Sequence, residues 1–84
     1  NDKCYFNCFP NPAQNHLNIE SFGFTNLINI NIYDASGRKV YQDKWVSNYM
    51  NNHNTIEINN LEKGIYLVEV SDEFSTRIKR FIHQ

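Results

Sequence analysis

The fold is decided by residues 27–46, which read LININIYDASGRKVYQDKWV. Isoleucines at every second position are separated by asparagines, and this period of two is typical of a β-strand with one buried face. Asp34 and Gly37 then favour a type I turn followed by a bulge, because the Asp34 carboxylate can accept a backbone N–H two residues on and Gly37 can adopt a positive φ. Residues 39–46 return as the partner strand, so the stretch predicts an antiparallel hairpin.

The same alternation recurs along the chain and predicts about seven short strands, at residues 6–8, 17–20, 27–33, 39–46, 55–58, 64–71 and 74–83. The asparagine-rich residues 47–54 read as a surface loop, and Leu61 is expected to close one end of the core. We therefore predict an all-β fold, an antiparallel β-sandwich of the Ig-like, Greek-key kind, with no helix of useful length.

Charge and hydropathy argue against several classes of function. The net charge is −1, so no strong field favours nucleic acid or anionic lipid. No apolar run reaches the ~18–20 residues of a membrane helix, so direct membrane insertion is not predicted. The chain starts without an initiator Met or an apolar leader, and we expect it to be the C-terminal piece of a longer protein. Residues 1–5 are then the end of a linker, and residues 6–84 form the domain.

The two cysteines, Cys4 and Cys8, leave two interpretations open. In an extended strand they would lie roughly 13 Å apart, too far for a disulfide, although a tight turn would bring them together. Either Cys8 packs as a small hydrophobe while Cys4 lies in the linker, or the two form an intramolecular disulfide. Two thiolates alone do not fill a tetrahedral metal shell, so no metal site is expected.

No arrangement of residues points to catalysis. His16, His53 and His83 lack metal-ligand spacing and are expected to be solvated or strand-face residues. Neither a Gly-x-Ser-x-Gly elbow nor a Gly-rich phosphate loop occurs in the sequence. We therefore predict a protein that is not an enzyme, with no catalytic, cofactor-binding or metal-binding residues.

Four motifs follow one another in a fixed order: Phe9-Pro10-Asn11-Pro12-Ala13, Ile32-Tyr33-Asp34-Ala35-Ser36-Gly37-Arg38, Leu61-Glu62-Lys63-Gly64-Ile65-Tyr66-Leu67-Val68-Glu69-Val70 and Arg77-Ile78-Lys79-Arg80-Phe81-Ile82. In this order they resemble the type A C-terminal sorting domain of the type IX (Por) secretion system of the Bacteroidetes. The resemblance covers about residues 8–84. The sequence departs from the pattern at Cys8, where a Val or similar residue is usual, and at its end, His83-Gln84, where a Lys is common.

The resemblance implies a seven-stranded β-sandwich at the C-terminus of a secreted cargo. Such cargo crosses the inner membrane by a Sec signal peptide, folds in the periplasm and is carried over the outer membrane by a dedicated translocon with an outer-membrane shuttle barrel. The sorting domain is the address that this machinery reads, and a cell-surface sortase often removes it. The implied location is the cell surface or the extracellular space.

Several motif residues have a simple structural interpretation beside the functional one. Pro10 and Pro12, on either side of Asn11, end a strand or mark the junction between linker and domain. Asp34, Gly37 and Arg38 form a turn, from which the Arg38 guanidinium can present a donor fork to a partner. Gly64 supplies an unusual φ, and Tyr66 is expected in the core.

The last strand carries the main candidate for partner recognition. The simple interpretation is that the charges on this edge strand prevent aggregation and have no other role. The alternative hypothesis is that the translocon reads this edge and its cations through strand addition; the residues proposed for this contact are Arg77, Lys79, Arg80, Phe81 and Ile82.

Two further functions compete with secretion sorting. A carbohydrate- or surface-binding β-sandwich appended to a secreted enzyme would use Tyr41, Trp45 and Tyr49 as a sugar-stacking face. An Ig-like spacer in an adhesin would have a purely structural role.

Overall fold

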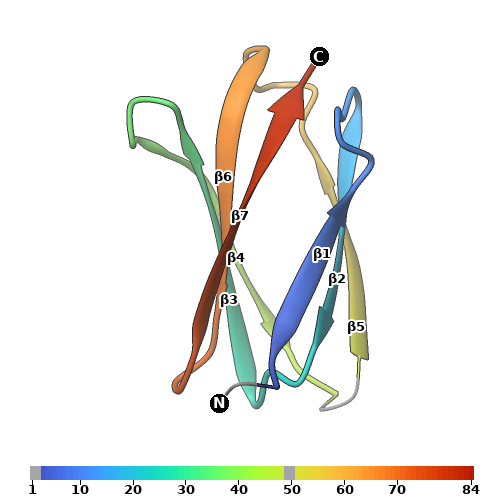
Figure 1. Cartoon of the computed structure of the whole chain (residues 1–84), viewed down its shortest axis with the longest axis vertical. Helices are drawn as coiled ribbons and strands as arrows, with labels where there is room; N and C mark the ends of the chain where they lie inside the picture. The colour runs from blue at the N-terminus through green and yellow to red at the C-terminus, as the bar shows by residue number, and fades with distance from the viewer. Residues whose placement is uncertain (1–2, 49–50) are drawn as a thin grey trace.

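The computed structural model describes residues 3–48 and 51–84. This part of the chain forms two sheets that face each other, without a helix (Figure 1). The strands are β1 (Tyr5–Phe9), β2 (His16–Phe22), β3 (Leu27–Asp34), β4 (Lys39–Val46), β5 (Asn51–Glu57), β6 (Gly64–Ser71) and β7 (Thr76–His83). Within the described residues, no helix is long and apolar enough to span a membrane.

The strand order confirms the predicted fold class. One sheet has the order β1-β2-β5 and the other β4-β3-β6-β7, with every neighbouring pair antiparallel. The chain changes sheets after β2, after β4 and after β5, which gives the Greek-key connections of an Ig-like sandwich. The predicted hairpin joins β3 to β4, and its pairing shifts register between Ile32 and Tyr33, as expected for a bulge beside the turn.

The core lies between the sheets and consists of the inward side chain of every second strand residue. The isoleucines of β3 are fully buried, and β6 contributes Val68 and Val70 in the same way. Burial of one such side chain contributes about 1.5–3 kcal/mol to stability. Leu61 packs against the cluster from the turn after β5, which confirms its predicted place at the end of the core.

The prediction of a surface loop at residues 47–54 is wrong in its second half. β5 begins at Asn51 and pairs with β2 without interruption, from Asn51 opposite Phe22 to Glu57 opposite His16. Asparagine has a low strand propensity, but the tertiary partner β2 overrides it by supplying the whole ladder of backbone hydrogen bonds. Tyr49, part of the proposed sugar-stacking face, lies outside the described residues.

The expected place of Cys4 in a linker is also wrong. Its side chain is 2% exposed and belongs to the core cluster. Gly23, at φ 82°, makes this possible, because a Cβ there would come within 2.8 Å of the Lys3 carbonyl oxygen and 3.0 Å of the Cys4 Cα. Cys8 packs against the core as expected, and burial raises the pKa of its thiol. Both cysteines are free, so the disulfide alternative does not apply.

Candidate recognition site

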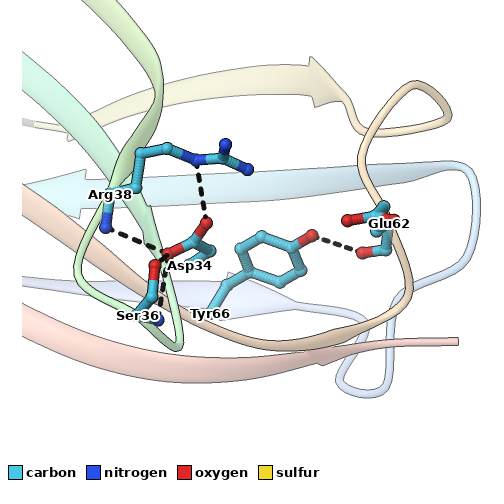
Figure 2. A network of polar contacts seen from close by, with 5 residues as sticks. All are labelled: Asp34, Ser36, Arg38, Glu62 and Tyr66. Atoms are coloured by element: carbon cyan, nitrogen blue, oxygen red, sulfur yellow. Dashed lines mark hydrogen bonds and ion pairs between the residues drawn. The ribbon is translucent and has the colours of Figure 1, made fainter.

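The Asp34 turn is held by its own side chains, as predicted. The Gly37 N–H donates to the Asp34 carbonyl at 2.9 Å, with Gly37 at φ 89°. Asp34 Oδ1 accepts the Ser36 hydroxyl at 2.6 Å and the backbone N–H groups of Ser36 and Arg38, each at 3.0 Å (Figure 2). These bonds, led by the Ser36 hydroxyl, hold the pKa of Asp34 below its ordinary value. Arg38 Nε donates to Asp34 Oδ2 at 3.1 Å, so the proposed donor fork is partly engaged inside the turn.

Tyr66 is a core residue, as predicted. It is 5% exposed, and its ring stacks on Phe81 with 5.4 Å between ring centroids. Its hydroxyl donates to the Glu62 carbonyl, which ties β6 to the preceding turn (Figure 2). Burial raises the pKa of the Tyr66 hydroxyl. Gly64 adopts φ 154° where this turn enters β6, which confirms the unusual φ expected there.

The Pro-Asn-Pro motif has a structural role at the edge of β7. We call residues 10–13 the clasp. Asn11 Oδ1 accepts the Ile82 N–H at 2.9 Å, and Asn11 Nδ2 donates to the Arg80 carbonyl at 3.4 Å. The Asn11 side-chain amide thus makes the hydrogen bonds to β7 that the backbone of a neighbouring strand would otherwise make. Ala13 N then donates to the Ile82 carbonyl and Gln84 N to the Ala13 carbonyl, each at 2.8 Å.

His83 reinforces the clasp and is not solvated. It is 4% exposed, and its Nδ1 lies 3.1 Å from the Ala13 carbonyl while Nε2 lies 3.1 Å from the Leu61 carbonyl. A neutral imidazole donates to one of these oxygens, whereas the imidazolium donates to both. The expectation of a solvated or strand-face residue holds for the exposed His16 and His53; His83 is a strand-face residue of β7, and its side chain joins three segments in the interior.

The predicted recognition residues of β7 do not form one cluster. Phe81 is fully buried, so its side chain is not accessible to a partner while the domain is folded. Arg77 and Lys79 share the side of Phe81 but lie where β7 passes β1. There Arg77 Nε donates to the Cys4 carbonyl at 3.0 Å, and Lys79 lines a depression with Cys8, to which Arg80 and Ile82 also contribute. Alternation places Arg80 on the opposite, outward side.

The outward side of β6 and β7 carries an apolar surface around Arg80. We call it the outer β6–β7 face; its members are Ile65, Leu67, Ile78, Arg80 and Ile82. Ile65 lies opposite Ile82 and Leu67 opposite Arg80, and the four apolar side chains are 37–57% exposed. Within the described residues, no hydrogen bond or ion pair engages the Arg80 guanidinium.

Three residues of this face, Ile65, Leu67 and Ile78, are not among the recognition residues that the sequence predicts. Residues 64–71 were predicted as a strand with Tyr66, Val68 and Val70 on one side, and the apolar side chains of the other side were not considered. The outer side of this strand also carries large apolar residues in its first half, before Glu69 and Ser71, and this predicts either burial of that half or an exposed apolar patch. That signal was readable in the sequence.

Tyr41 and Trp45, which the competing carbohydrate hypothesis proposes for sugar stacking, already form hydrogen bonds within β4. The Tyr41 hydroxyl and Trp45 Nε1 each donate to Asp43 Oδ2 at 3.2 Å. Both rings are half-buried and pack against the core cluster. They are therefore partly used in holding β4 on the sandwich.

The fold and these surfaces define a class, a small β-sandwich recognition module. In residues 3–48 and 51–84, no three metal-ligating side chains gather at one place. The family model of the secretion system C-terminal sorting domain matches residues 7–84, and the chain belongs to this family. A search of curated proteins found no match.

Family membership confirms the predicted function. The domain is a C-terminal signal for type IX secretion and is not itself catalytic. It interacts with the type IX secretion machinery and directs export out of the cell, to the surface or the extracellular space. The competing carbohydrate-binding function is not favoured.

Proposed function

We propose that the type IX machinery recognises this domain through the outer β6–β7 face, with Arg80 and Ile82 at its centre. The supporting observation is that four exposed apolar side chains surround one unengaged guanidinium: Ile65 lies opposite Ile82, Leu67 lies opposite Arg80, and Ile78 lies two residues before Arg80 on β7. Apolar patches of about 300–600 Å² are the largest on ordinary monomers and are often functional. Arginine set among apolar contacts is typical of the residues that dominate binding energy at protein interfaces.

The clasp favours docking on this face over strand addition at the end of β7. Strand addition needs unpaired backbone N–H and C=O groups along an edge. Asn11 and Ala13 already bond both backbone groups of Ile82, and Asn11 also bonds the Arg80 carbonyl. An incoming strand would have to displace the clasp first, whereas the outward side chains are accessible while it is closed.

The finer route to the surface is part of the same proposal. A Sec signal peptide takes the cargo into the periplasm, and the sorting domain is then read by the translocon and the outer-membrane shuttle barrel. The linker from the upstream cargo ends before Cys4, because Cys4 belongs to the core and β1 begins at Tyr5. A cell-surface sortase acts once the cargo is outside. Family membership supports this route, because type IX sorting domains serve export from the cell.

Export of a reporter fused to this domain tests the face. Arg80→Glu and Ile78→Ser change outward side chains, so we expect secretion to fall at least tenfold while the melting temperature of the isolated domain changes little. The matched controls are Lys44→Glu on β4 and Phe74→Ser in the β6–β7 turn, both exposed, and we expect normal secretion from them. Equal secretion of Arg80→Glu and Lys44→Glu would refute recognition through this face.

The same assay separates the outer β6–β7 face from the flank between β7 and β1. Lys79→Glu reverses a charge in the flank depression, which Arg80 and Ile82 also line, and alters no member of the outer β6–β7 face. A loss of secretion with Lys79→Glu, but not with Arg80→Glu, would move the recognition surface to the flank. Deletion of residues 76–84 is less informative, because it also removes a strand of the core.

A further inference from the structure

β5 forms an open edge of the three-stranded sheet. All seven of its residues pair with β2 on one side. In the part of the chain that the structure describes, no strand pairs with its other side (Figure 1, yellow strand at the right). Such an edge presents a row of backbone N–H and C=O groups that can pair with another chain.

Among the described residues, each of the other sheet edges carries some protection that β5 lacks. The clasp covers the C-terminal part of the β7 edge, at Arg80, Ile82 and Gln84, and β1 lies against β7, where Arg77 bonds the Cys4 carbonyl. The edge strand β4 carries Lys39, Asp43 and Lys44, and charges of this kind oppose edge-to-edge pairing. β5 contains one charged residue, Glu57, at its end, has no proline, and keeps an unbroken register with β2.

A hydrogen bond just after β5 shows which residues of β5 direct their backbone N–H and C=O groups to the open edge. Ile58 N donates to the Asn15 carbonyl at 3.0 Å, which continues the ladder between β5 and β2. Bonded and non-bonded pairs alternate in antiparallel ladders, so even-numbered residues bond β2. The odd-numbered residues direct their N–H and C=O groups to the open edge; they are Asn51, His53, Thr55 and Glu57.

We propose that a second copy of this domain pairs with that edge, β5 against β5, antiparallel and centred on Asn54. This register sets His53 opposite Thr55 and Asn51 opposite Glu57, so odd-numbered residues meet odd-numbered residues along the whole strand. Each of these pairs exchanges two backbone hydrogen bonds. The two three-stranded sheets become one continuous sheet related by a two-fold axis, which is the commonest symmetry of homo-oligomers.

A second copy fits this edge in charge and in hydrogen-bonding parity, and the register centred on Asn54 is the one that pairs the whole strand. No like charges meet in this register, because each Glu57 faces the neutral Asn51 of the other copy. A slip by one residue would set outward groups against groups already bonded to β2. The Asn54 side chains meet across the axis, where amides can donate to and accept from each other. The net charge of −1 per domain adds little repulsion.

The dimer is weak and depends on concentration. A single strand pair buries less than the roughly 800 Å² per partner of a standard stable interface. Sedimentation equilibrium of the 84-residue chain from about 10 μM to 1 mM measures the association. We expect the weight-average mass to rise from monomer toward dimer over this range.

Thr55 provides the matched variants. Thr55→Pro removes a backbone N–H that faces the open edge, at an edge position where proline is tolerated. Thr55→Val keeps that N–H, and both variants lose the hydroxyl bond to Asn18 Oδ1 (2.8 Å). We expect Thr55→Val to dimerise like the unmodified chain and Thr55→Pro to stay monomeric at 1 mM. A monomeric unmodified chain at 1 mM, or a folded Thr55→Pro that dimerises equally, would overturn the proposal.

Asn54→Asp is a second test that does not depend on proline. It sets two carboxylates opposite each other across the axis, so we expect the dimer to dissociate at low salt and to recover by at least tenfold in affinity at 1 M NaCl. A damaged fold would not respond to salt in this way. Loss of the dimer in Ile82→Ser, with retention in Asn54→Asp, would place the second copy on the outer β6–β7 face and refute pairing through β5.

Discussion

Replacing Asn11 by alanine tests the structural role of the Pro-Asn-Pro motif. The change removes the acceptor for the Ile82 N–H (2.9 Å) and the donor to the Arg80 carbonyl (3.4 Å). A typical intramolecular hydrogen bond contributes about 0.5–1.5 kcal/mol net. The second bond is long and the Asn11 side chain is exposed, so water replaces part of what is lost. We expect the free energy of unfolding to fall by about 1–2 kcal/mol.

That loss is large for a domain of this size. Stabilities of about 0.05–0.15 kcal/mol per residue are usual, so 1–2 kcal/mol is a considerable share of the total. For domains of 60–100 residues, 1 kcal/mol shifts the melting temperature by about 4–8 °C. Thermal and urea unfolding followed by circular dichroism measure the effect, and we expect a melting temperature lowered by roughly 4–16 °C.

The matched control is Asn7→Ala, at an exposed strand position of β1. It removes the same chemical group, and we expect a change within about 0.5 kcal/mol. Asn11→Asp keeps the acceptor for Ile82 and loses the donor, so its stability should lie between those of the unmodified chain and Asn11→Ala. If Asn11→Ala is as stable as Asn7→Ala, the clasp does not hold β7 and the reasoning fails.

Three further predictions concern the core, the N-terminal crossing and acid. Ile30→Ala empties a fully buried position and should cost about 2–5 kcal/mol in urea unfolding; a loss below 1 kcal/mol would contradict the assigned core. Gly23→Ala should destabilise by about 1–3 kcal/mol, because residue 23 has a positive φ and a Cβ would meet the Lys3 carbonyl oxygen at 2.8 Å; an unchanged melting temperature would contradict this. Burial raises the pKa of Asp72, but N–H groups of Thr25, Phe74 and Ser75 outweigh it, so the pKa is lowered overall. The resulting stability is present above the ordinary carboxyl pKa and is lost as the pH falls through the lowered value. In thermal unfolding from pH 7 to pH 2, the melting temperature of Asp72→Asn should therefore fall less than that of the unmodified chain. Parallel curves of melting temperature against pH would contradict this.

The sandwich could be predicted from the sequence because apolar and polar residues alternate clearly within its strongest strands. The β3 isoleucines and the Asp34 to Gly37 turn fix a hairpin by local chemistry alone, and Gly64 marks the entry to β6 in the same way. β5 was missed in part because its asparagines carry no apolar alternation. Its identity as a strand depends on pairing with β2, which is distant in sequence.

The candidate site was less predictable, because it depends on which side of β7 each residue occupies. Three cations within four residues read as one cluster in the sequence, but strand alternation places Lys79 and Arg80 on opposite sides of β7, although both border the flank depression. Phe81 and His83 are taken into the interior by contacts with Tyr66, Ala13 and Leu61. Local sequence does not contain these contacts.

The clasp also fixes when the domain can fold. Residues 10–13 lie about 70 positions before their bonding partners on β7. Contacts of such long separation in sequence form slowly and only once the whole loop is available. A chain that has only partly entered the compartment where it folds therefore lacks both the last strand of one sheet and the cover of its edge until residues 76–84 arrive, and a truncated product would expose the core that β7 covers.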